Sequence, residues 1–222
     1  MEKICAEGLT FFGKTNRLIS HELKNILAII SETLGLLDEL MELSESGMGL
    51  TPERLRSMNA SIIEEVERAN TVIRCMNTFA HSVDEFIGEV DLNKTISLMI
   101  QLSKLNPVSK TVQINFSETD SITIHTSSFF LENLLYHALL FAMSAAGPDK
   151  HIQISLHSSG DKTGVEFSGI ASSGFESFPS EHAGLLASAI AAEISSDVSS
   201  GKFHVVLPKK MSGGPIETLL VT

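Results

Sequence analysis

The chain has 222 residues and a formal net charge of −11, with 43% apolar and 19% charged residues. This composition is typical of a folded protein with one or two domains, and it excludes collagen-like, disordered and mini-protein chains. Because the 27 acidic residues outnumber the 16 basic ones, a nucleic-acid partner is not expected. Two cysteines make no disulfide framework, and no apolar run suffices to span a membrane. We therefore expect a soluble, cytoplasmic protein with no membrane partner.

The first part of the chain has the apolar periodicity of two long helices. From about residue 9 to residue 43, apolar residues recur at steps of three and four, which predicts an amphipathic helix. Thr51 and Pro52 supply an N-cap and a first-turn proline for a second helix, whose apolar stripe covers residues 55–87. Two such helices joined by a short connection predict an antiparallel hairpin. Its apolar side predicts a homodimer in which two hairpins form a four-helix bundle.

Beyond Gly88 the pattern changes to shorter elements, which predict an α+β sandwich with helices on one face of a sheet. The strands at 111–116 and 121–125 are expected to face each other across a turn at 117–120, and those at 151–157 and 162–167 to form a hairpin. The domains expected are a helical hairpin in 1–88, the sandwich in 89–210 and a C-terminal tail in 211–222. The other expected elements are helices at 91–105, 127–145 and 181–194, and a strand at 202–207.

One histidine on the first helix stands out by its neighbours. On a helical wheel His21 lies outside the apolar arc, so it is expected to be exposed, and Asn25 follows one turn later on the same face. Glu22 lies toward the apolar side, a costly place for a carboxylate. A lone exposed histidine usually has no function, but an imidazole beside a carboxylate and an amide can attack phosphorus. The candidate catalytic residues are therefore His21, Glu22 and Asn25.

These residues carry a resemblance to a known family. The segment Ser20-His21-Glu22-Leu23-Lys24-Asn25 resembles the H-box of two-component histidine kinases, in which the histidine is the phosphoacceptor. Together with the hairpin, the passage at 89–93 and the order of elements, the resemblance covers about residues 9–208. It implies a hairpin that dimerises into a four-helix bundle and a second domain of the GHKL ATPase type. Ile26 departs from the pattern, because many family members have a bending proline there.

The nucleotide motifs that this resemblance implies are degenerate. In the N-box-like segment at 133–138, His137 stands where the family has a magnesium-binding asparagine, and imidazole is a poor ligand for Mg²⁺. The segment at 168–174 lacks the aspartate that the family uses for adenine, and the lid is cut to 175–180. Leu186 replaces a glycine of the phosphate-binding loop. We therefore expect no cofactor, no metal site and no ATP-dependent kinase activity, with His137 as a packed structural residue.

An H-box with a degenerate nucleotide site predicts a histidine phosphotransfer protein of a phosphorelay. His21 is expected to take a phosphoryl group from one response-regulator receiver domain and pass it to another, with Mg²⁺ supplied by the receiver. A first alternative is a pseudokinase scaffold that dimerises and binds a regulator without carrying phosphate. A second is a kinase with unusual nucleotide binding. The remaining histidines are expected to be surface or sheet residues.

Overall fold

The computed structural model describes residues 2–44, 51–118 and 120–211 and divides the chain into two compact units. One unit, the hairpin unit, comprises residues 14–78, and the other, the α/β unit, comprises residues 1–13 and 79–222. The first residues of the long N-terminal helix therefore belong with the α/β unit, where Phe11 packs edge-on against Phe79 at 5.3 Å between ring centroids. The expected domain division at residue 88 stays a prediction.

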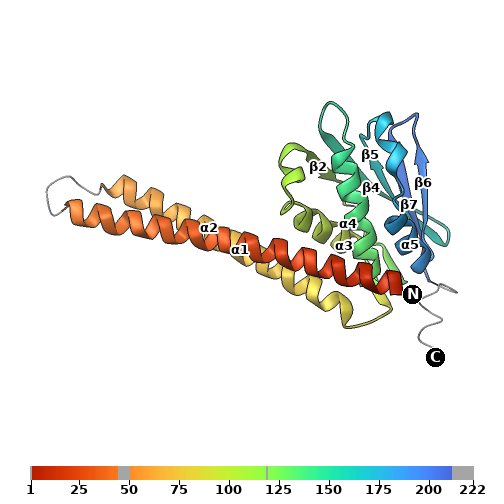
Figure 1. Ribbon diagram of the computed structural model, residues 1–222, viewed down its shortest axis with the longest axis horizontal. Helices are drawn as coiled ribbons and strands as arrows, with labels where there is room; N and C mark the ends of the chain where they lie inside the picture. Colours follow the sequence, from red (N-terminus) through yellow and green to blue (C-terminus); the bar gives the residue numbers. More distant parts are fainter. Residues whose placement is uncertain (1, 45–50, 119, 212–222) are drawn as a thin grey trace. The chain divides into compact units, whose positions relative to one another are not determined.

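Two helices, α1 (Glu2–Ser44) and α2 (Pro52–Ala80), lie side by side along the hairpin unit (Figure 1). The expected N-cap is present, because the Thr51 hydroxyl accepts a hydrogen bond of 3.3 Å from the Arg54 amide. Ile19, Ile26 and Val72 are buried in this unit. Among the described residues, no helix combines the length and the apolar character that crossing a membrane requires.

The α/β unit contains a five-stranded sheet in the order β2-β4-β5-β7-β6 and a two-stranded sheet of β1 and β3. β2 runs parallel to β4, and the other pairs are antiparallel. The helices α3, α4 and α5 cover one face of the larger sheet (Figure 1), which confirms the α+β sandwich. The bounds are β1 Gly88–Asp91, α3 Leu92–Ser103, β2 Gln113–Phe116, β3 Thr123–Thr126, α4 Ser128–Ser144, β4 His151–Ser159, β5 Lys162–Ser168, α5 Glu181–Ala189, β6 Glu193–Asp197 and β7 Lys202–Pro208, with short 3-10 helices at His81–Val83, Pro107–Thr111 and Ser172–Ser177.

A cluster of phenylalanines forms the core between helices and sheet. Strand residues alternate between the faces, so Phe167 of β5 and Phe203 of β7 are buried and stack with ring centroids 4.6 Å apart. Phe141 of α4 stacks on Phe178, which precedes α5, at 4.1 Å, and Phe178 packs against Phe203 at 4.7 Å. Aromatic contacts therefore connect α4, the segment before α5 and two central strands.

The expected helix at 181–194 is wrong in its second half. α5 ends at Ala189, Ala191 adopts a left-handed φ of 55°, and the chain then forms β6. β6 pairs with β7, with Ile194 opposite Val205. The run of alanines is compatible with a helix by propensity, but pairing with the edge of β7 decides the outcome.

The expected turn at 117–120 does not join two paired strands. β2 pairs with β4, with Ile114 opposite Ile152, whereas β3 pairs with β1, with Ile124 opposite Val90. The partner strands, β4 for β2 and β1 for β3, are distant in sequence. The local alternation of apolar and polar residues therefore could not reveal the pairing. The hairpin of β4 and β5 is confirmed, with Leu156 opposite Val165. Of the expected tail, Met211 is buried and its amide donates to the His125 carbonyl at 2.9 Å, and residues 212–222 lie outside the described residues.

Candidate functional site

The first part of the candidate site is the exposed pair of His21 and Asn25 on α1. Both side chains are exposed, and Nδ1 of His21 lies 3.2 Å from Nδ2 of Asn25. With its amide nitrogen toward the ring, Asn25 donates to Nδ1, and a neutral ring then carries its proton on Nε2. With the amide turned over, the asparagine oxygen accepts from Nδ1–H, and the Nε2 lone pair is free. Asn25 can therefore select the ring nitrogen that acts as a nucleophile.

Glu22 lies in a different environment from His21. Its carboxylate forms an ion pair with the guanidinium of Arg68 on α2 and is only 17% exposed. Arg68 also donates to both carboxylate oxygens of Glu65, at 3.2 and 3.3 Å. Burial lowers the pKa of Arg68, but the hydrogen bonds and negative charges of Glu22 and Glu65 outweigh it, and the net shift is upward. Arg68 therefore stays charged and holds the two acids on one side of the hairpin.

Of the three sequence-predicted residues, the structure brings His21 and Asn25 together. The third, Glu22, is held by Arg68. Sequence reasoning missed Arg68, which is 46 residues from Glu22 along the chain. A helical wheel of α1 alone cannot show which residue of α2 faces Glu22. The available signal was the position of Glu22 toward the apolar side, which called for a basic partner on the facing helix.

A cleft of about 370 Å³ lies beside α4, where the resemblance would place a nucleotide. Its described lining includes no lysine, arginine or carboxylate, although a triphosphate with Mg²⁺ requires such groups. Among the described lining residues, His137 alone has a side chain that can carry a charge. The described lining residues are Asn106, Val108, His137, Leu140, Phe141, Ser144, Phe178 and Ser180.

The other N-box-like asparagine faces away from solvent. Asn133 is fully buried, and neither polar atom of its amide has a hydrogen-bond partner among the described residues. Phe178 fills space beside the cleft by stacking on Phe141. Since the charged ligands are missing and the remaining amide is sealed in the core, these residues do not fit Mg-ATP.

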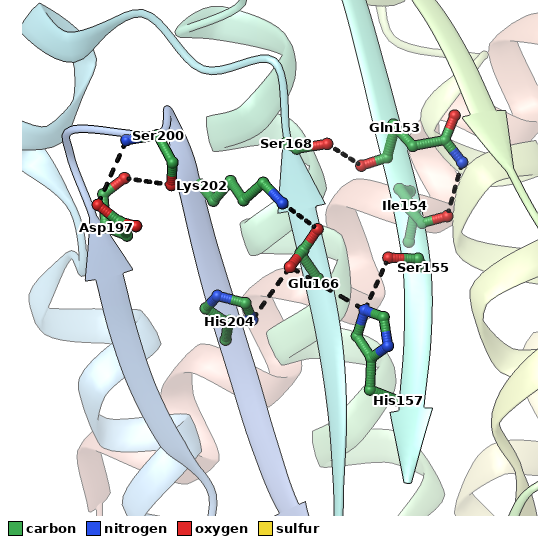
Figure 2. A network of polar contacts seen from close by, with 10 residues as sticks. All are labelled: Gln153, Ile154, Ser155, His157, Glu166, Ser168, Asp197, Ser200, Lys202 and His204. Carbon is green, nitrogen blue, oxygen red and sulfur yellow. Dashed lines mark hydrogen bonds and ion pairs between the residues drawn. The ribbon is translucent and has the colours of Figure 1, made fainter.

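A second group of histidines lies on the sheet face opposite the helices (Figure 2). Glu166 of β5 accepts a hydrogen bond of 3.0 Å from Lys202 of β7, with ring nitrogens of His204 at 3.8 Å and His157 at 4.0 Å. His157 also lies 3.1 Å from the Ser155 hydroxyl. The contacts of Glu166 are cross-strand polar pairs on a solvated sheet face, and the contact of His157 with Ser155 lies within β4. No cluster of three or more His, Cys, Asp or Glu side chains suited to a metal ion occurs among the residues that the structure describes.

One buried acid belongs to the α/β unit. Glu132 of α4 is 3% exposed, and its Oε1 accepts a hydrogen bond of 3.2 Å from the Ser128 hydroxyl. Burial raises the pKa of Glu132 to about 7, and hydrogen bonds from Ser82 and Ser128 oppose that rise. The carboxyl group is therefore protonated in weakly acidic solution and titrates near neutrality.

Solved structures resemble this chain at low sequence identity. A bacterial phosphotransferase matches with a TM-score of 0.50 at 13% identity, over 89% of this chain and 95% of its own. The Acinetobacter baumannii histidine kinase AdeS matches with a TM-score of 0.45 at 15% identity, over 87% of this chain and 98% of its own. The ATP-binding domain of PrrB from Mycobacterium tuberculosis matches with a TM-score of 0.44 at 15% identity, over 59% of this chain and 99% of its own.

No protein-family model matches the sequence, and no curated protein does so either. The likeness is therefore one of structure. The match to the phosphotransferase includes both the hairpin and the α/β part of the chain. The fold, a helical hairpin followed by an α+β sandwich, is similar to that of the phosphotransferase.

Proposed function

We propose that this chain is a histidine phosphotransfer protein that relays a phosphoryl group between response-regulator receiver domains through His21. The observation that carries the proposal is the exposed imidazole of His21 with the Asn25 amide at Nδ1. The cleft that does not fit Mg-ATP adds support, because such a protein takes its phosphate from another protein. The bacterial phosphotransferase with the same fold is named for this class of reaction.

The chemistry requires one nucleophilic nitrogen and a means of orienting it. When the Asn25 oxygen accepts from Nδ1–H, the lone pair on Nε2 attacks the phosphorus of a receiver aspartyl phosphate. The P–N bond forms as the P–O bond to the aspartate breaks, and the aspartate leaves as a carboxylate. Transfer to a second receiver reverses these steps. Magnesium chemistry belongs to the receiver in this scheme.

The proposal includes a second copy of the chain. The hairpin unit exposes large apolar side chains, among them Leu27 at 61% and Ile63 at 50%. A monomeric protein rarely exposes a contiguous apolar surface along two long helices. A second hairpin packed against this surface forms a four-helix bundle and leaves polar positions such as His21 on the outside.

A phosphorelay assay tests the proposal. The protein is mixed with radiolabelled phosphorylated receiver domains and, separately, with labelled ATP. We expect label from a receiver and none from ATP. His21→Gln should abolish labelling without changing the fold, because an exposed position contributes little packing.

His157→Gln and His81→Gln are matched controls. Both residues are exposed and lie near an acid, since His81 Nδ1 is 2.6 Å from Asp84, and we expect both variants to accept label. Label from ATP on the wild-type protein would indicate a kinase. No label from any cognate receiver, with receiver binding intact, would favour the pseudokinase scaffold.

A further inference from the structure

Arg68 connects the candidate phosphoacceptor segment of α1 to α2. One nitrogen of its guanidinium contacts Glu22 and the other contacts Glu65, one turn away on its own helix. The two carboxylates are 17% and 14% exposed, whereas Arg68 is 44% exposed. A planar guanidinium can serve two carboxylates at once with fixed geometry. The direction of the Glu22 side chain is therefore set by α2 and not by the neighbouring His21.

This direction matters for the chemistry of a phosphorylated His21. Adjacent side chains leave a helix about 100° apart, so a carboxylate at position 22 reaches the imidazole at position 21 only by bending along the helix or through one water molecule. A carboxylate so placed is a general base. It takes a proton from water as the water oxygen attacks phosphorus, the P–N bond breaks with its electron pair going to the imidazole, and inorganic phosphate is released.

We propose that Arg68 is a positioning residue that holds the Glu22 carboxylate away from the phosphorylated imidazole and so protects the phosphohistidine from hydrolysis. This inference rests on the proposed function, because it assigns a role to Arg68 in the lifetime of the phosphorylated state. Asn25, which already lies at Nδ1 of His21, remains free to orient the ring. The carrier thereby keeps an acid beside its nucleophile without exposing the phosphoryl group to that acid.

The test measures the lifetime of phosphate on His21 of the full chain. Phosphoramidate loads histidine chemically, so loading does not depend on any receiver, and the His21→Gln protein gives the signal from other histidines. Phosphate release is then followed by ³¹P NMR. We expect Arg68→Gln to shorten the lifetime about a hundredfold, at the low end of the effect of a positioned general base. Arg68→Lys should restore most of the lifetime, because it keeps a cation beside Glu22.

A double variant separates positioning from stability. In Arg68→Gln/Glu22→Gln the freed base is absent, so we expect the lifetime to return to that of the wild-type protein. Arg74→Gln removes the same charge from the same helix, where Arg74 contacts Thr71, and should leave the lifetime unchanged. Melting curves of all variants establish that they are folded.

Two results would overturn the inference. One is an unchanged lifetime in Arg68→Gln, even if the melting temperature falls, because that is the signature of a structural ion pair. The other is a shortened lifetime that the added Glu22→Gln does not restore. Failure of the proposed function looks different: chemically loaded His21 would show the lifetimes expected here, yet no receiver would exchange phosphate with it.

Discussion

The hairpin unit and the α/β unit differ in how far they enclose their large apolar side chains. In the hairpin unit Leu27 and Ile63 are exposed, and so are the candidate residues His21 and Asn25. In the α/β unit the large aromatic residues are enclosed, with Phe203 fully buried among three other rings. Two helices alone cannot enclose a core, whereas a sheet covered by helices can. The proposed second hairpin would cover the exposed side chains of the hairpin unit, whereas the aromatic core of the α/β unit is already enclosed.

The largest effect is expected at the proposed interface between two hairpins. A charge at Ile63, as in Ile63→Asp, should convert a dimer into a 24.0 kDa monomer, because an unpaired carboxylate cannot be buried between helices. Sedimentation at micromolar concentration measures the change. Asn70→Asp adds the same charge at an exposed polar position and should leave the dimer intact. A wild-type protein that sediments as a monomer would contradict the proposed dimer.

The closed core of the α/β unit should respond to loss of one ring. Phe203→Ala removes contacts with Phe141, Phe167 and Phe178 and should lower the free energy of unfolding by about 3–5 kcal/mol. Urea denaturation measures this loss in the free energy of unfolding. The control Phe86→Ala makes the same change at a side chain that is 40% exposed and should cost about 1 kcal/mol or less. Equal losses in the two variants would mean that the cluster is not a closed core.

The buried acid of the α/β unit should make stability depend on pH. Between pH 4.5 and about 7 the native state holds a proton on Glu132 that the unfolded chain releases, so the free energy of unfolding falls as the pH rises. Above that window the native state contains a buried carboxylate. Glu132→Gln should remove this slope and stabilise the protein at pH 8 by an amount on the order of 3 kcal/mol.

Denaturation at pH 5 and pH 8 measures the difference for Glu132→Gln. The matched variant is Glu89→Gln, because Glu89 is exposed in the same unit, and it should keep the slope of the wild-type protein. A slope that survives in Glu132→Gln would assign the pH dependence to other groups.

The smallest expected effect is that of nucleotide on the α/β unit. Millimolar Mg-ATP should raise the melting temperature by less than about 1 °C, since only binding to the native state stabilises it. The reason is the uncharged lining of the cleft beside His137 together with the buried Asn133. Thermal denaturation with and without Mg-ATP measures the shift. A rise of several degrees would show that the cleft binds nucleotide after all.

The local sequence pattern was sufficient to predict most helices and strands and part of the candidate site. The spacing of apolar residues predicted both long helices, and Thr51 with Pro52 marked the start of the second. The positions of His21 and Asn25 one turn apart on a polar face followed from helix geometry alone. Their exposure agrees with that geometry, while their catalytic role, like that of Glu22, stays a prediction.

The amino-acid sequence by itself determined the fold class, because the periods of 3.6 and 2 are local properties of helices and strands. It also placed the imidazole and the amide of the H-box-like segment together. Only the tertiary structure decided that residues 193–197 form β6, that β2 and β3 belong to different sheets, and that Glu22 binds Arg68. Each of these depends on a partner distant in the chain, and the free energy of such a contact is not encoded in the neighbouring residues.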